Sequence, residues 1–170
     1  MAPRPTLFLT CGLPGSGKTT LARRLEQEVP ALRLTADEWL HQLYPTITTA
    51  EAEEGTLRGR VEGLQWPLAL RALQLGLDVI LDWGLWSRAE RDHYRTGARD
   101  AGVRVVLCLL DPPLDALWTR LSRRNADRPT GAFEIPQEAL QRWAKLFQRP
   151  TAEERALYDP WQAGQGAADQ

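Results

Sequence analysis

The chain has 170 residues, a formal net charge of −1, and 43% hydrophobic and 25% charged residues. This is the size and composition of one soluble globular domain, and the balanced charge excludes the overall basic surface that dominates many nucleic-acid-binding proteins. No apolar stretch approaches the roughly 18 residues of a membrane span, and the first apolar run is too short for a secretory signal. We therefore expect a cytoplasmic protein in which Cys11 and Cys108 are buried free thiols.

The first part of the chain alternates apolar runs with amphipathic segments. The continuous apolar run over residues 6–11 predicts a strand, and the periodic pattern over 18–29 predicts a helix. Residues 31–35 predict a short second strand. A helix is expected to follow at once, because Thr35 and Glu38 have the spacing of a capping box.

A long helical region follows over residues 51–75. Thr48 and Glu51 repeat the capping-box spacing ahead of it. Pro67 and three glycines earlier in the region weaken the helix, which predicts either a kink or two helices. We expect Gly76 to end the region.

The next strand is expected over residues 78–82. Ser87 and Glu90 have the spacing of a third capping box, which predicts a helix that starts there and ends near residue 101. The fourth strand is expected over 103–110. The remaining segments are a helix that starts at the sequence DPP and runs to about residue 125, a helix over 137–147 and a short helix after residue 151.

Strands that are apolar throughout are usually buried on both faces, which predicts a parallel sheet with helices on each side. Four such strands alternating with helices predict a small three-layer α/β/α domain, and a fifth strand is not evident. We find no linker or repeat, and expect a single domain over residues 1–160 with a flexible tail over 161–170.

Between the first strand and the first helix the chain reads GLPGSGKT, which matches the phosphate-binding pattern G-x-x-x-x-G-K-[ST] in the required context. Glycines let backbone N–H groups converge on phosphate oxygens, and the helix N-terminus adds its free amides. Lys18 is expected to reach the β- and γ-phosphates, and the Thr19 hydroxyl to bind Mg²⁺. The expected nucleotide-binding residues of this loop are Gly12, Pro14, Gly15, Ser16, Gly17, Lys18, Thr19 and Thr20.

Other nucleotide-binding classes fit less well. The dinucleotide pattern G-x-G-x-x-G fails in this loop, and we find neither DxxG at the third strand nor the guanine-reading N-K-x-D. Asp82 ends the third strand but is followed by Trp83, whereas a motor ATPase usually places there a glutamate that activates water. These absences favour transfer to a bound acceptor over hydrolysis.

With its loop GLPGSGKTT, the aspartate in LTADEW, the strand VILDWG and the arginine-rich LWTRLSRRNADRP, the chain resembles small P-loop kinases of the zeta-toxin, chloramphenicol phosphotransferase and polynucleotide kinase type. The resemblance spans Thr6 to about Arg128 and implies a P-loop fold of four or five strands with an arginine-bearing helical lid. It also implies ATP over GTP as the phosphoryl donor.

The resemblance implies that Asp37 takes the proton from the acceptor hydroxyl, and a carboxylate there could also orient that hydroxyl for attack. An acidic residue in a first helical turn is favoured by the helix dipole alone, so the alternative is a purely structural aspartate. Asp82 is expected beside the loop, where it binds Mg²⁺ or the acceptor, or instead caps nearby amides.

The segment LWTRLSRRNADRP places four arginines within nine residues, and Arg120 and Arg124 share one helix face. The resemblance implies that such arginines close over the phosphates and stabilise transition-state charge. We expect Arg124 and Arg120 to have this role, and Arg128 is the next candidate for it. A solvated basic face is the alternative.

Further residues are candidates for the acceptor side. We expect Trp83, His41 and Arg88 there, and Arg91 is a further candidate. For Arg88 and Arg91 alike, an ordinary exposed surface arginine is the favoured alternative. Trp39, Trp83 and Trp86 could stack on a flat substrate, although core packing explains them equally well.

The leading hypothesis is an ATP- and Mg²⁺-dependent kinase that phosphorylates a hydroxyl of a small molecule. The first alternative is a polynucleotide or nucleoside 5′-hydroxyl kinase. The sequence argues against it, because no arginine follows Asp37 within one helical turn to bind the acceptor's phosphate. The second is a nucleotide-binding regulatory module without an acceptor of its own. The oligomeric state is left open.

Overall fold

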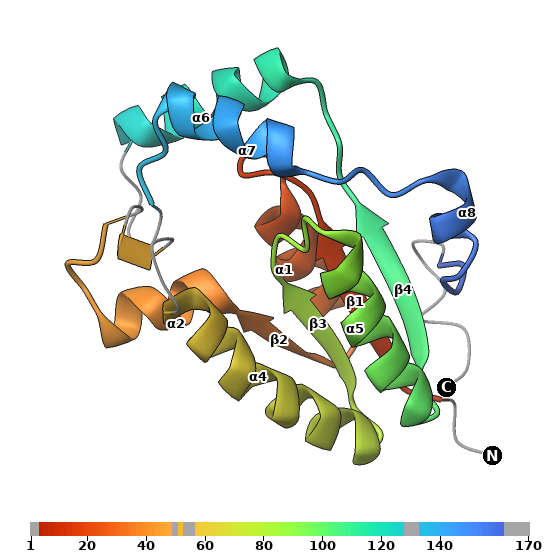
Figure 1. Cartoon of the computed structure of the whole chain (residues 1–170). Coiled ribbons are helices and arrows are strands. Elements are labelled where there is room, and N and C mark those ends of the chain that lie inside the picture. The colour runs from red at the N-terminus through yellow and green to blue at the C-terminus, as the bar shows by residue number, and fades with distance from the viewer. Residues whose placement is uncertain (1–3, 49–50, 53–56, 128–132, 162–170) are drawn as a thin grey trace.

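The structure is a computed structural model, and it describes residues 4–48, 51–52, 57–127 and 133–161. Its centre is a four-stranded parallel sheet with the order β2-β3-β1-β4 (Figure 1). The strands are β1 (Thr6–Cys11), β2 (Ala31–Thr35), β3 (Asp78–Asp82) and β4 (Arg104–Leu109). The predicted α/β fold and all four predicted strands are confirmed.

The first strand, β1, lies in the interior of the sheet. Leu7 pairs with Val79 of β3 and with Val105 of β4, and all six residues of β1 are buried. A strand buried on both faces is mostly apolar, as this one is, and its buried Thr10 hydroxyl donates to the carbonyl of Trp83 at 2.8 Å. The phosphate-binding loop therefore leaves the sheet from its most enclosed strand.

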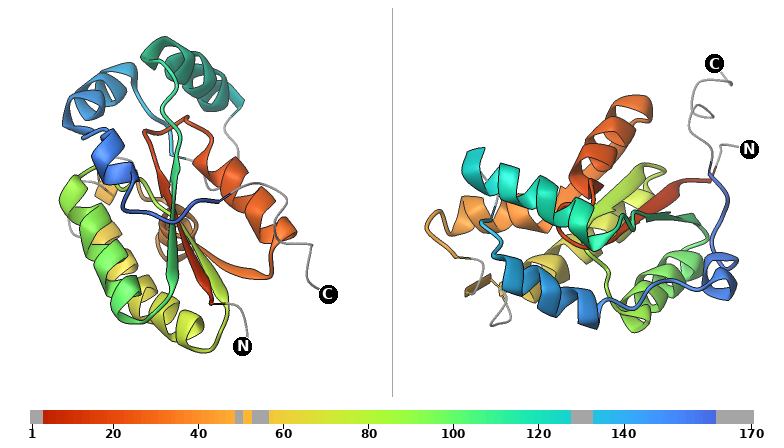
Figure 2. Two further views of the ribbon diagram at one scale, coloured as in Figure 1. Left: turned by 90° about the vertical axis from the view of Figure 1, so that its right-hand side faces the viewer. Right: turned by 90° about the horizontal axis from the view of Figure 1, so that it is seen from above.

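Seven helices of the described residues surround the sheet. They are α1 (Lys18–Glu28), α2 (Ala36–Leu43), α4 (Leu57–Gln74), α5 (Arg88–Asp100), α6 (Leu114–Asp127), α7 (Gln137–Leu146) and α8 (Ala152–Arg155). In Figure 2, α1 covers one face of the sheet and α4 and α5 cover the other, while α6 and α7 lie across the end at which β4 stops. The two faces carry separate hydrophobic clusters. The three-layer arrangement is confirmed.

The predicted capping boxes differ in outcome. Ser87 and Glu90 form one at the start of α5, as predicted. The box predicted for Thr35 and Glu38 is wrong, since no side chain caps α2. The hydroxyl of Thr35 donates to Asp82 instead, at 3.1 Å, and the carboxylate of Glu38 accepts from Arg33 at 3.0 Å. These tertiary partners outcompete the local capping bonds.

The long helical region is described in two parts, on either side of residues 53–56. The carboxylate of Glu51 accepts from the N–H of Thr48 at 2.8 Å, and the hydroxyl of Thr48 accepts from the N–H of Glu51 at 3.3 Å, as a capping box requires. Helix α4 then runs from Leu57 to Gln74 and includes Pro67. The break expected earlier in the region falls partly on residues 53–56, which lie outside the described residues. Gly76 has a φ of 87°, which suits the left-handed end of a helix, as predicted.

The last described residues run along the outer side of β4. The N–H of Asp159 donates to the carbonyl of Val105 at 2.8 Å, and its carboxylate accepts from the N–H of Val105 at 2.7 Å. Trp161, the first residue of the predicted tail, packs edge-on against Phe8 with 5.8 Å between ring centroids. Residues 162–170 lie outside the described residues. No fifth strand forms in the described part of the chain.

Within the described residues, no helix combines the length and apolarity that crossing a membrane demands. Cys11 and Cys108 are buried and unpaired, as expected.

Candidate active site

The loop between β1 and α1 is held in a conformation that requires glycine. Gly15 and Gly17 have φ angles of 81° and 98°, and Gly12 donates its N–H to the carbonyl of Gly84 at 3.1 Å. A Cβ on Gly12 would lie 2.3 Å from the carbonyl oxygen of Leu110, a distance that no side chain tolerates. The close approach of two backbones therefore explains the first glycine, and left-handed φ angles explain the other two.

Lys18 lies at the start of α1 and turns its amine back to the loop. Its Nζ donates to the carbonyl of Leu13 at 2.9 Å. Burial lowers the pKa of Lys18 to about 8, although the carboxylates of Asp82 and Asp37 oppose the change. A partly desolvated ammonium beside free helix N-terminal amides is well suited to a phosphate anion.

Asp82 ends β3 beside the same loop and is 6% exposed. Burial raises the pKa of its carboxyl, while hydrogen bonds from Thr19 and Thr35 and the charge of Lys18 oppose that rise. A hydroxyl and a carboxylate therefore meet next to Lys18. Oxygen ligands of this kind are those that Mg²⁺ prefers.

The loop residues fit a triphosphate. The hydroxyl of Ser16 is buried and has no hydrogen-bond partner among the described residues, so the loop holds a donor that its own fold leaves unused. For Mg²⁺, Thr19 and Asp82 are suitable, but no group of three or more His, Cys, Asp or Glu side chains gathers in the described part of the chain. A cation bound here would take its remaining ligands from phosphate and water.

A cavity of about 1370 Å³ extends from this loop to α2, α4 and α7. One part of its wall is the loop and the basic side chains of α1 and α6. The other part comes from α2, α4, α7 and the segment after β3. Lys18 and Asp37 both line this one cavity.

Asp37 is paired with a residue that the sequence analysis missed. The Nη1 of Arg58, in α4, donates to Oδ1 of Asp37 at 2.5 Å, and both side chains line the cavity. The side chains are 36% and 44% exposed, so their remaining atoms are accessible. No local signal joins the two residues, since they are 21 positions apart and are brought together by the packing of α2 against α4.

The expected arginines divide into those that reach the cavity and those that do not. Arg120 and Arg124 of α6 line it, and Nη1 of Arg120 lies 3.5 Å from the carbonyl of Gly15. Arg124 donates to the carbonyl of Phe133 at 3.1 Å, and burial lowers its pKa. Arg123 is exposed and does not line the cavity. Arg128 lies outside the described residues.

Two further carboxylates, Glu62 and Glu90, line the cavity together with Asp37, and neither was singled out from the sequence as a site residue. Glu62 lies one helical turn after Arg58, and burial raises its pKa to about 7, with smaller contributions in the same direction from Glu90 and Asp37. Glu90 contributes one oxygen to the capping box of α5. The four-residue spacing of Arg58 and Glu62 was a readable signal, because residues so spaced share a helix face.

The predicted acceptor residues are not all at the cavity. Trp83 lines it but is only 2% exposed, and its indole N–H donates to Gln65 at 2.9 Å. His41 does not line it, and packs on Phe133 with 4.2 Å between ring centroids. Arg88 is exposed, forms an ion pair with Asp92 at 3.4 Å and does not line the cavity.

The remaining predicted aromatic and basic residues also separate. Trp86 lines the cavity next to Trp143 of α7, with 5.5 Å between ring centroids. Trp39 packs against the core and does not line the cavity. Arg91 is neither on the surface nor in the cavity, since it is wholly buried. Trp143 was not predicted from the sequence, because it lies 57 positions beyond Trp86.

Comparison with known proteins identifies the family. The profile of the AAA domain family matches residues 7–150, which include the loop, both aspartates and α6. The chain belongs to the AAA domain family. The match begins in β1 and ends after α7, so it covers most of the described fold.

Solved structures of other proteins show a similar fold. The chain resembles a protein in the structure of the Pnkp1/Rnl/Hen1 RNA repair complex, with a TM-score of 0.68 and 21% identity over 94% of this chain and 48% of that chain. It resembles Chaetomium thermophilum Kti12 in complex with ADP-AlF3, with a TM-score of 0.69 and 17% identity over 91% and 86%. A gluconokinase from Sinorhizobium meliloti 1021 gives a TM-score of 0.58 and 19% identity over 89% and 80%.

At these identities the likeness concerns the fold, which is that of small P-loop kinases. This AAA domain chain spans about half the length of the RNA-repair chain that it matches. The predicted P-loop kinase-like fold is thereby confirmed.

Proposed function

We propose that the protein is an ATP- and Mg²⁺-dependent kinase that phosphorylates a hydroxyl of a small molecule. The observation that carries this proposal is one cavity with Lys18 and the phosphate-binding loop in one wall and Asp37 in the other. ATP, when bound, supplies the phosphoryl group. Direct transfer requires both reactants in one enclosed space, and this cavity provides it.

Each residue has a defined part in the proposed reaction. Asp37 accepts the proton of the acceptor hydroxyl while the oxygen of that hydroxyl bonds to the γ-phosphorus of ATP. The bond between this phosphorus and the oxygen of the leaving diphosphate breaks at the same time. Lys18 neutralises charge on the phosphates. Thr19 and Asp82 hold Mg²⁺, and Arg120 and Arg124 of α6 stabilise the charge on the transferred group.

The test is phosphoryl transfer from labelled ATP across a library of hydroxyl compounds. Asp37→Asn should lower turnover by about 10²–10⁴-fold, because it removes the proton acceptor while keeping the shape. Glu38→Gln is the matched control, since Glu38 lies next in the same helical turn and is paired with Arg23 and Arg33. Full turnover by Asp37→Asn would remove Asp37 from the role of base.

A polynucleotide 5′-hydroxyl kinase is a second candidate, which one specific observation favours. The packing of α4 brings Arg58 to Asp37, so a guanidinium is present where the sequence offered none to bind an acceptor's phosphate. The carboxylates of Glu62 and Glu90 in the same part of the cavity oppose a polyanionic acceptor.

Labelled ATP and a 5′-hydroxyl oligonucleotide distinguish the two candidates. We expect no label on the oligonucleotide. Labelling that depends on Asp37 would replace the small-molecule proposal with the second candidate. Tight nucleotide binding without transfer to any acceptor would instead favour a regulatory module.

A further inference from the structure

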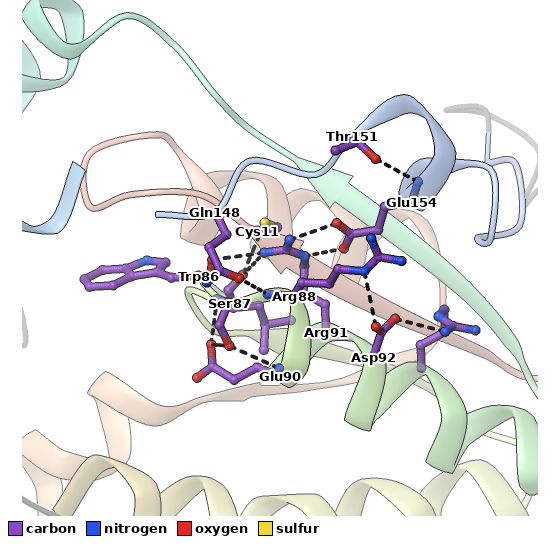
Figure 3. Close-up of polar contacts among 12 residues, drawn as sticks. Cys11, Trp86, Ser87, Arg88, Glu90, Arg91, Asp92, Gln148, Thr151 and Glu154 are labelled. Atoms are coloured by element: carbon purple, nitrogen blue, oxygen red, sulfur yellow. Dashed lines mark hydrogen bonds and ion pairs between the residues drawn. The ribbon is translucent and has the colours of Figure 1, made fainter. Parts of the chain in front are cut away.

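Arg91 of α5 has its guanidinium enclosed in the protein beneath the segment that follows β3 (Figure 3). It is 0% exposed, and its Nε and Nη2 donate to the two carboxylate oxygens of Glu154 at 2.6 and 3.0 Å. Glu154 lies in α8, 63 positions later in the chain. A bidentate pair of this kind fixes both the distance and the orientation of the guanidinium.

The remaining nitrogen of Arg91 holds the segment after β3. Its Nη1 donates to the carbonyl of Leu85 at 2.9 Å and to that of Trp86 at 3.1 Å. Leu85 has a φ of 47°, the one positive value at a non-glycine residue in the described part of the chain. A leucine in this left-handed region is strained, so the conformation persists because surrounding contacts impose it.

Other groups secure the same two carbonyls. The thiol of Cys11 donates to the carbonyl of Leu85 at 3.4 Å, and the N–H of Gln148 donates to that of Trp86 at 2.9 Å. Each carbonyl therefore accepts from Arg91 and from a second donor on a different element. Figure 3 shows the guanidinium of Arg91 lying between the carboxylate of Glu154 and Trp86.

The held segment makes direct contact with the phosphate-binding loop. The indole Nε1 of Trp86 donates to the carbonyl of Gly12 at 3.2 Å, and Gly12 in turn donates its N–H to Gly84 at 3.1 Å. The ring of Trp86 also lines the acceptor part of the cavity. A continuous series of hydrogen bonds thus joins Glu154 to the first glycine of the loop.

We propose that Arg91 is a positioning residue for the active site: held by Glu154, it fixes the carbonyls of Leu85 and Trp86, and so places the Trp86 indole against Gly12 and the acceptor. The proposal rests on the proposed function for the identity of the nucleotide and of the acceptor, but not for the position of Trp86. A buried ion pair stabilises a fold weakly compared with apolar residues of similar volume, so stability alone accounts poorly for this one.

The decisive variant is the double substitution Arg91→Leu with Glu154→Leu. It removes both buried charges together and leaves neither unpaired, so we expect the fold to be retained, but both carbonyls lose the donor that Arg91 supplied. Asp92→Ala with Arg95→Ala is the matched control, because it removes an ion pair of 2.9 Å in the same helix that does not touch the segment after β3.

The position of Trp86 is read directly by fluorine NMR of protein labelled with 5-fluorotryptophan. Trp86→Phe assigns the resonance among the seven tryptophans. In the double leucine variant we expect the Trp86 resonance to shift and broaden while that of Trp161 is unchanged. In the control variant neither should change. An unchanged Trp86 resonance in a folded double variant would overturn the proposal.

A second readout is the affinity for Mg²⁺-ATP by calorimetry. We expect the double leucine variant and Trp86→Phe to bind about three- to tenfold more weakly, because each loses the hydrogen bond that supports Gly12. Unchanged affinity in both would contradict the link to the loop. If the double variant does not fold, Arg91→Lys tests the proposal by the same two measurements. Glu154→Gln keeps one oxygen that accepts a hydrogen bond from Arg91, so it should partly preserve the wild-type Trp86 resonance.

This design separates two failures. Absence of ATP binding by the wild-type protein would end the proposed kinase function. The fluorine resonance is recorded without nucleotide, so it tests the positioning role whether or not that function holds.

Discussion

Asp37 and Arg58 form an ion pair at 2.5 Å within the cavity, and this contact joins the first turn of α2 to the first turn of α4. The proposed base is therefore already oriented before an acceptor arrives. The charge of Arg58 also opposes the rise that burial causes in the pKa of Glu62, so one guanidinium acts on two carboxylates of the cavity.

Replacing Arg58 should weaken catalysis through Asp37. In Arg58→Leu the carboxylate loses its partner and its fixed orientation, and we expect kcat/KM for the identified acceptor to fall roughly tenfold. Arg60→Leu is the matched control, because Arg60 is exposed on the same helix and does not line the cavity. Equal rates in the two variants would show that Arg58 does not orient the base.

The first glycine of the loop should tolerate no side chain. In Gly12→Ala the added Cβ would meet the carbonyl of Leu110 at 2.3 Å, so we expect a loss of about 1–3 kcal/mol in unfolding free energy and weaker nucleotide binding. Gly63→Ala is the control, because nothing lies within 4 Å of the new Cβ and alanine favours a helix. Denaturant unfolding of both variants tests this, and a neutral Gly12→Ala would refute the close approach.

The arginines of α6 should differ in their effect on turnover. Arg124→Ala and Arg120→Ala each remove a cation from the cavity, and we expect a decrease in kcat of about 10²–10³-fold for at least one of them. Arg123→Ala removes a neighbouring exposed cation outside the cavity and should have little effect. Steady-state kinetics decide the matter. Three equal rates would mean that α6 supplies no catalytic charge.

The burial of Glu62 should make stability depend on pH. The pKa is raised from 4.5 to about 7, so the folded protein retains a proton that the unfolded chain has lost between these values. Stability should therefore decline as pH rises from about 4.5 to 7, and Glu62→Gln should remove that part of the decline. Melting temperatures across this range provide the measurement. Parallel curves for wild type and variant would show that Glu62 titrates normally.

The sequence was most informative where the site is continuous along the chain. The loop from Gly12 to Thr19 lies between one strand and one helix, so local spacing alone predicts its position and its ligand. The resemblance to small P-loop kinases pointed to Arg120 and Arg124, and both line the cavity because they share one face of a single helix. The four strands followed from their uninterrupted apolar character.

The acceptor side was harder to predict, because it is assembled from distant segments. Arg58 reaches Asp37 only when α4 packs on α2, and Trp143 reaches Trp86 only when α7 crosses the end of the sheet. The capping box expected at Thr35 failed for the same kind of reason, since Asp82 is a neighbour in space and not in sequence. Spacing along the chain carries no information on such pairings.

The contact between Asp159 and Val105 affects whether the edge of the sheet can pair with a second molecule. A strand at the border of a sheet exposes free amides and carbonyls on which another chain could form an intermolecular sheet. Here both polar groups of the Val105 backbone on that side are occupied, one of them by a carboxylate, which offers no ladder to continue. The border of β4 is thereby closed to edge-to-edge aggregation at this residue.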